Sequence, residues 1–150
     1  MSSIGQASIY KFIKEKKFLI HSLSKVKMGA SIASAPYIWL EEDAPPKVFV
    51  DALLYALSEA KEGLPNPENW ASFSKDFIAA IGLKKQSDLY KQSISINVLK
   101  KEDVIIFTPT SNNRSKGFVN IVPVVKIEVG TNQSVEEIAS SLKIAFESCE

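Results

Sequence analysis

The sequence predicts a single α+β domain over residues 1–150, built on a mostly antiparallel β-sheet with about three α-helices. Three observations support this class. Strand-like apolar runs lie in both halves of the chain, two stretches of helical spacing separate them, and an amphipathic helix closes the sequence. With 150 residues, 45% apolar and 23% charged, the chain has the length and composition of one globular domain.

The N-terminal region predicts a β-hairpin. Aromatic and β-branched residues dominate positions 9–13 and 18–23, on either side of the polar segment 14–17. A helix over residues 11–17 is the competing interpretation, because some apolar residues there also lie at helical spacing. We favour the two strands.

The segment after the hairpin predicts a loop, a short strand and an acidic turn. Small residues dominate positions 28–36, which favours a loop, and the apolar residues 37–40 favour a short strand. Glu41, Glu42 and Asp43 then form the turn that leads to the first helix.

Two helices are expected in the middle of the chain. Pro46 suits a first helical turn, where its missing N–H would have no partner in any case. From Lys47 onward, apolar residues recur every three or four positions until Gly63 and Pro65 end the pattern. A shorter helix follows over residues 72–81.

The second half of the chain returns to strands. Residues 93–98 alternate strictly between polar and apolar side chains, and the polar segment 100–103 follows as a hairpin turn. Residues 104–107 then predict a buried strand that Pro109 ends.

A polar loop over residues 111–117 leads to the last elements. Residues 118–129 predict one or two strands interrupted at Pro123, because proline cannot donate to a strand ladder. In the final helix, Ser134 and Glu137 have the spacing of a capping box. The apolar face of this helix is formed by Val135, Ile138, Leu142, Ala145, Phe146 and Cys149.

The composition argues against most catalytic and metal chemistry. The chain has one histidine (His21), one cysteine (Cys149) and one arginine (Arg114). With so few of these residues, a metal-ligand cluster or a Ser/Cys–His–acid triad is nearly excluded. We expect the protein to bind no metal and no cofactor and to have no enzymatic activity. We expect His21 to be a structural residue of its strand. Cys149 is expected to pack or to be a frayed terminal thiol, with its pKa raised by Glu147 and Glu150.

Charge and hydropathy restrict the partners and the compartment. Eighteen basic against seventeen acidic residues leave a net charge of +1, so no strong field attracts nucleic acid or an anionic membrane. No apolar run approaches the ~20 residues of a spanning helix, and the N-terminus lacks the pattern of a secretion signal. A lone cysteine suits the reducing cytoplasm.

Two segments are candidates for partner binding. In the first, Tyr37 and Trp39 precede Glu41, Glu42 and Asp43, and rigid rings beside charges suit a protein interface. The alternative is a solvated turn whose acids favour the start of a helix.

The second candidate segment is the polar loop with Asn112, Asn113, Arg114 and Lys116. Loops of this kind often hold recognition residues, and the arginine and lysine suit a carboxylate or a phosphate. A plain polar connection between two strands is the alternative.

Four segments together carry a family resemblance. They are residues 49–58 before a Pro-rich link, residues 77–82, the turn over residues 114–118 and the closing helix. Residues 134–145 of that helix match the form S-x-E-E-[IL]-x-x-x-L-x-x-A. Over approximately residues 46–149 the chain resembles the small immunity proteins of bacterial contact-dependent growth inhibition (CDI) systems.

The resemblance implies a cytoplasmic, non-catalytic protein, monomeric or weakly dimeric. Such a protein binds the C-terminal toxin domain of a CDI effector, often a nuclease, and blocks its active site or its access to substrate. Against a basic nuclease, the acidic turn would imitate nucleic-acid phosphates. Two other classes stay open from the residues alone. One is an adaptor or chaperone-like module of a secretion system, and the other is a small enzyme that uses residues such as Asp51 or Lys126.

Overall fold

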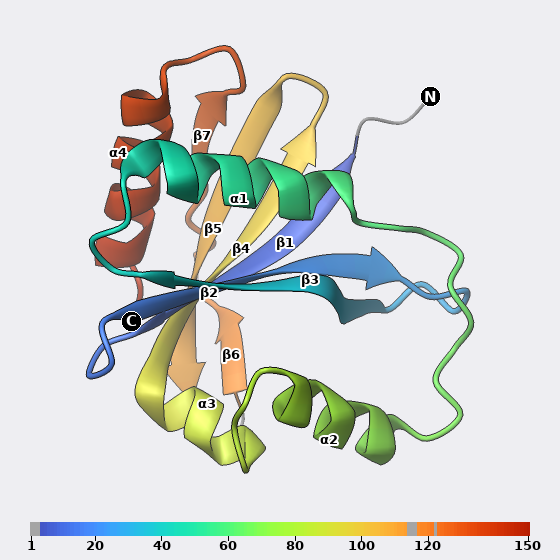
Figure 1. Cartoon of the computed structure of the whole chain (residues 1–150). Helices are drawn as coiled ribbons and strands as arrows, with labels where there is room; N and C mark the ends of the chain where they lie inside the picture. The colour runs from blue at the N-terminus through green and yellow to red at the C-terminus, as the bar shows by residue number, and fades with distance from the viewer. Residues whose placement is uncertain (1–3, 114–116, 122) are drawn as a thin grey trace.

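The computed structural model describes residues 4–113, 117–121 and 123–150. These residues form a twisted antiparallel sheet with helices on both faces (Figure 1). The elements are β1 (Gly5–Phe12), β2 (Lys17–Lys25), β3 (Ser31–Glu41), α1 (Pro46–Ser58), α2 (Trp70–Ala80), α3 (Gln86–Gln92), β4 (Ser93–Lys101), β5 (Val104–Asn113), β6 (Gly117–Asn120), β7 (Ile127–Gly130) and α4 (Val135–Glu147). The sheet has seven strands in the order β3-β2-β1-β4-β5-β6, and β7 pairs with β5 beyond the end of β6.

The α+β class, the antiparallel sheet and the C-terminal helix are confirmed. So is the N-terminal hairpin, in which β1 and β2 pair with Ile9 opposite Ile20, both fully buried. The alternative helix over residues 11–17 is wrong. Lys16 adopts a positive φ of 54° in the hairpin turn instead, a conformation that no α-helix contains.

The loop expected over residues 28–36 is wrong for most of its length. β3 begins at Ser31 and pairs with β2 as far as Glu41, with a register shift where β2 passes from His21 to Ser22. The serines and alanines of this stretch have weak strand propensity. The neighbouring strand supplies their hydrogen-bond partners, so tertiary pairing decides the conformation.

The larger core lies between one face of the sheet and the helices α1 and α4. Phe49 and Leu53 of α1 pack there with Leu142 and Phe146 of α4, and each side chain is at most 7% exposed. α1 begins at Pro46, as predicted. At the start of α4 the Ser134 hydroxyl accepts a hydrogen bond from the Glu137 amide at 3.1 Å, which confirms the serine half of the expected capping box.

A smaller core lies on the opposite face of the sheet, under α2 and α3 at the lower end of the view in Figure 1. α2 agrees with the helix expected over residues 72–81. It begins two residues earlier, where the Asn69 side chain accepts a hydrogen bond from the Ser72 amide. α3 was not expected, because seven residues with one buried leucine show no helical period.

Pro109 does not end its strand as predicted. β5 continues to Asn113, and Pro109 lies between the residues that pair with β7 and those that pair with β6. Neither β6 nor β7 pairs with Pro109, so the backbone N–H that proline lacks is not needed for a hydrogen bond to either strand. The two outer strands lie on either side of Pro123, as the sequence predicts.

Candidate partner-binding surface

The acidic turn between β3 and α1 is held in place by its backbone. The Glu42 amide donates a hydrogen bond to the Lys16 carbonyl at 2.9 Å, and the Ala44 amide donates to the Glu41 carbonyl at 3.0 Å. The side chains of Glu41, Glu42 and Asp43 are exposed and, with Lys16, they border an open hollow of about 430 Å³. We call this feature the acidic hollow. Its carboxylates face solvent on a fixed backbone.

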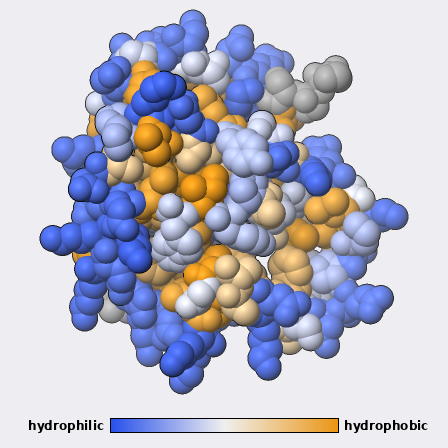
Figure 2. All heavy atoms as spheres, viewed as in Figure 1, coloured by the Kyte–Doolittle hydropathy of each residue, from blue (hydrophilic) through white to orange (hydrophobic). Residues whose placement is uncertain are grey.

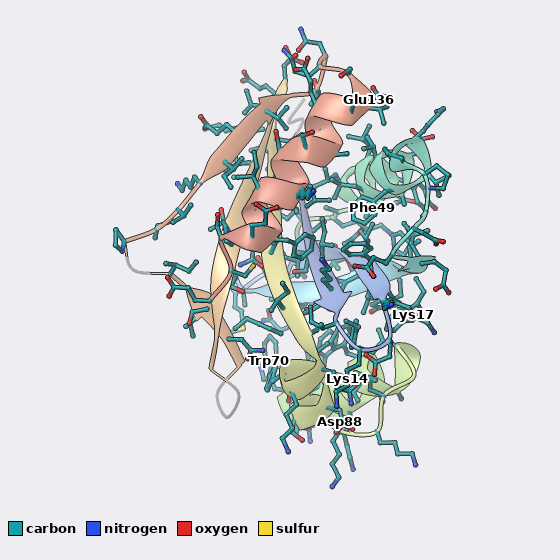
Figure 3. All side chains as sticks on the ribbon, turned by 90° about the vertical axis from the view of Figure 1, so that its left-hand side faces the viewer. Lys14, Lys17, Phe49, Trp70, Asp88 and Glu136 are labelled. Carbon is teal, nitrogen blue, oxygen red and sulfur yellow. The ribbon has the colours of Figure 1, made fainter. Side chains whose placement is uncertain are left out.

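An apolar groove of about 400 Å³ adjoins the acidic hollow, and Glu42 borders both. The floor of the groove comes from the sheet and from both helices of the larger core. It consists of Phe18, Phe49, Ile94, Leu142 and Phe146. Figure 3 shows Phe49 between α1, α4 and the strands.

Lys11 reaches across one side of this apolar groove. Its ammonium nitrogen lies 3.7 Å from a carboxylate oxygen of Glu42. The same nitrogen lies 6.0 Å from the ring centres of Phe18 and Phe146, at the outer limit of a cation–π contact. The Lys11 side chain is 31% exposed and that of Glu42 is 41% exposed. A partner can therefore reach both groups.

The aromatic residues predicted beside the acidic turn face the other side of the sheet. Trp39 is 39% exposed and packs against Phe12, with ring centres 5.1 Å apart, and Tyr37 packs against Phe77 of α2. Side chains alternate along a strand, so Leu40, and not Trp39, belongs to the α1 face. Glu41, Glu42 and Asp43 are thus brought together, while Tyr37 is part of the smaller core.

The described part of the second predicted segment, Asn112 and the backbone of Asn113, lies in β5, which is separated from β3 by three strands. The side-chain amide of Asn112 donates hydrogen bonds to the carbonyls of Tyr90 and Ser93, the latter at 2.8 Å, so it holds α3 against β5. Asn113 ends β5, and its side chain lies outside the described residues. Arg114 and Lys116 lie outside them altogether.

His21 is a structural residue, as expected. Its ring is 1% exposed, and its two nitrogens lie 2.8 Å from the Ser22 carbonyl oxygen and 3.2 Å from the Tyr10 hydroxyl. Burial lowers the pKa of His21 from 6.5 to about 4, so the ring is neutral at pH 7.

Cys149 packs against the larger core, as predicted. The pKa of its thiol is raised, again as predicted, but the cause is different: burial raises it, whereas the sequence suggested the neighbouring glutamates.

The residues named for a possible enzyme lie on the surface. Asp51 lies on α1, where it accepts a hydrogen bond from Lys47 at 2.8 Å, and Lys126 is exposed just before β7. Within the described ranges, no group of three or more His, Cys, Asp or Glu side chains is placed to hold a metal ion. In the same ranges no helix is both long and apolar enough to cross a membrane.

Apolar residues are also scattered singly over the outer surface. Val48 and Tyr55 of α1 are 46% and 53% exposed, and Figure 2 shows hydrophobic surface beside α1 within largely hydrophilic surroundings. Single exposed apolar side chains are normal on a protein surface. The apolar groove differs from them because it is concave and adjoins the acidic hollow.

The fold and this surface define a small α+β protein with a preformed acidic and apolar surface, suited to the binding of another protein. The chain belongs to the CDI immunity protein family, CdiI, whose family model matches residues 6–149. This match includes the N-terminal hairpin, which the resemblance seen in the sequence left out.

Solved structures with the same fold include a protein of unknown function from Neisseria meningitidis. It is 17% identical, with a TM-score of 0.76, and the match covers 98% of this chain and 96% of the other. A chain of the CdiA-CT/CdiI toxin and immunity complex from Yersinia pseudotuberculosis is 14% identical, with a TM-score of 0.75 and 98% of each chain covered. No curated protein matches the sequence significantly.

Proposed function

We propose that this protein neutralises the C-terminal toxin domain of a CDI effector by forming a tight complex with it in the cytoplasm. The observation that carries the proposal is the family match over residues 6–149. The same fold in a chain of a toxin and immunity complex supports it. The protein then needs no catalytic group of its own, because binding alone blocks the toxin.

The acidic hollow is the part of the surface that we assign to toxin contact. Glu41, Glu42 and Asp43 are exposed on a backbone fixed by two hydrogen bonds, so little backbone freedom is lost when they bind. A toxin that acts on nucleic acid has a basic active site. Carboxylates at fixed positions would take the place of substrate phosphates there, and the toxin we propose is a nuclease.

Trp39 lies at the edge of this contact surface. Its ring is 39% exposed in β3, the edge strand that ends at Glu41, so a partner that covers the acidic hollow can extend onto it. Tyr37 packs on Phe77 and Asn112 donates to two backbone carbonyls, so we do not assign these partly exposed residues to the toxin contact. The segment with Asn113, Arg114 and Lys116 stays a separate candidate, because β5, which ends at Asn113, is separated from β3 by three strands.

Co-purification tests the proposal directly. The tagged chain is expressed together with the toxin domain encoded by the reading frame immediately upstream. We expect a stoichiometric complex and the rescue of growth in cells that produce the toxin domain. Expression of both proteins without complex formation and without protection would contradict the proposal.

A charge variant tests the assigned surface. In Glu41→Gln/Glu42→Gln/Asp43→Asn, the three carboxylates are replaced by amides of nearly the same size. We expect slower association with the toxin domain at low salt and a weaker dependence of the rate on salt, because charge steering is removed. The control is Glu136→Gln/Glu137→Gln at the start of α4, which removes two carboxylates that border neither the groove nor the acidic hollow. An equal loss in both variants would remove the acidic hollow from the interface.

A further inference from the structure

The apolar groove is an open hollow above the larger core. Its floor side chains Phe49, Leu142 and Phe146 are each at most 7% exposed, yet the hollow above them measures about 400 Å³. The two helices and the strands approach one another here without a side chain that fills the space between them. A cavity of this size matches the pockets into which proteins take a large side chain or a small ligand.

The walls of the groove indicate an apolar occupant. Aromatic rings from three elements meet in it, and the ring of Phe18 lies 4.9 Å from that of Phe49 and 5.5 Å from that of Phe146. The charged residues Lys143 and Glu147 are one helical turn apart on α4 and border only the rim. An aromatic side chain that enters the groove would gain ring contacts on several sides.

The charge around the groove is uneven. On the side of β3 the groove opens into the acidic hollow, where three carboxylates face one lysine. Glu42, which the two hollows share, is already paired with Lys11 of this chain. A lysine or arginine of a partner would be attracted to these carboxylates, as Lys11 is attracted to Glu42.

We propose that the groove is the anchor site of the toxin interface and that it takes one large apolar side chain, preferably aromatic, from a toxin segment that also presents a basic residue to Glu41, Glu42 and Asp43. This inference rests on the proposed function. It adds the chemistry of the partner segment: an aromatic residue next to a lysine or arginine. Buried aromatic anchors beside charged pairs dominate the affinity of many protein interfaces.

The first test fills the groove from within. Ala139 lines it from α4 and is half-buried, so Ala139→Trp places a ring in the space while it leaves the floor residues intact. We expect the affinity for the upstream-encoded toxin domain to fall by at least about 30-fold, as for the loss of an interface hot spot. The matched control is Ala80→Trp at the exposed end of α2, which should bind like the wild type.

Folding is checked by melting temperature and circular dichroism. If Ala139→Trp lowers the melting temperature, Ala139→Met takes its place, because a flexible thioether fills an apolar gap with less strain. We expect the same direction and a smaller loss of affinity. Wild-type affinity in a folded variant at this position would overturn the groove proposal.

The second test concerns the charge beside the groove. Lys11→Met keeps a long apolar stem over the rings of Phe18 and Phe146 but releases Glu42. We expect association at low salt to become about threefold faster, and we expect no such gain when Glu42→Gln is also present. A merely structural role of Lys11 would lower the affinity instead, and slower association of Lys11→Met would overturn the proposed basic neighbour.

The two levels of proposal fail in different ways. If the wild-type chain binds and protects while the groove variants behave like the wild type, the groove proposal is wrong and the proposed function stands. If the wild-type chain neither binds the toxin domain nor protects cells, both are wrong.

Discussion

The Nε2 atom of His21 lies 3.2 Å from the Tyr10 hydroxyl oxygen, and both side chains are buried on the face of the sheet that α2 and α3 cover. The Nδ1 atom lies 2.8 Å from the Ser22 carbonyl oxygen, which can only accept, so Nδ1 carries the proton. Nε2 therefore accepts a hydrogen bond from the Tyr10 hydroxyl. The pair satisfies both nitrogens of a neutral imidazole, and burial disfavours the charged form.

The His21 pair predicts a loss of stability in mild acid. The pKa of His21 is about 4 in the folded protein, below the ordinary value of 6.5. Between these pH values the unfolded chain binds a proton that the folded chain does not, so the free energy of unfolding falls as the pH falls through this window. We expect a loss of about 2 kcal/mol between pH 7 and pH 5.

Urea denaturation at several pH values measures this effect. His21→Gln, whose side chain does not titrate, should be less stable at pH 7 and should lose less stability than the wild type between pH 7 and pH 5. Parallel pH profiles for the two proteins would show that His21 is not the cause.

Truncation of Leu142 in α4 is expected to leave a cavity in the larger core and to lower the stability of the fold. Its side chain is 6% exposed and lies among the apolar residues of α1 and the sheet. Leu142→Ala should lower the free energy of unfolding by about 2–5 kcal/mol. Ile144 on the same helix is 53% exposed, so Ile144→Ala should cost no more than about 0.5 kcal/mol. Thermal unfolding compares the two variants, and similar losses in both would contradict the packing described for α4.

Gly5 of β1 is expected to tolerate no side chain. A Cβ at this position would collide with the backbone carbonyl oxygen of Leu57 in α1, and neither backbone is free to move alone. Gly5→Ala should therefore cost about 1–3 kcal/mol through overpacking. The control is Gln6→Ala, because the next side chain points to the other face of the strand. If Gly5→Ala is as stable as the wild type, the C-terminal end of α1 must move to make room for the added methyl group.

Cys149 should be a slow nucleophile in the native protein. Burial raises the pKa of its thiol, so less thiolate is present at pH 8 than for a free cysteine. We expect iodoacetamide to modify the chain much faster in urea than in buffer. Mass spectrometry gives both rates without ambiguity, since the chain has one cysteine. Equal rates would mean that the C-terminal end of the chain is open in solution.

The elements with a strong local signal were predicted correctly from the sequence. The alternation of polar and apolar residues in β4, the helical spacing of apolar residues in α1 and the N-terminal cap of α4 are local sequence patterns, and each forms the predicted element. The poverty of histidine, cysteine and arginine likewise pointed to binding, and the family match agrees with an immunity protein. These features depend on residues that are close together in the chain.

The remaining features required contacts between distant residues. Ser31 and its small neighbours form a strand because β2 lies beside them, and Pro109 is tolerated because the outer partner of β5 changes at that point. The sequence placed the acids of residues 41–43 together, but it grouped Tyr37 and Trp39 with them, although the pleat turns these rings to the opposite face.

The apolar groove had no sequence signal, because its floor combines Phe18, Phe49, Ile94, Leu142 and Phe146 from four separate elements. By itself the sequence determined the class of fold, the local elements with a clear period, and the class of function. Only the tertiary structure decided which side chains share a surface. Strand pairing and helix packing bring together residues whose separation along the chain carries no information about their distance in space.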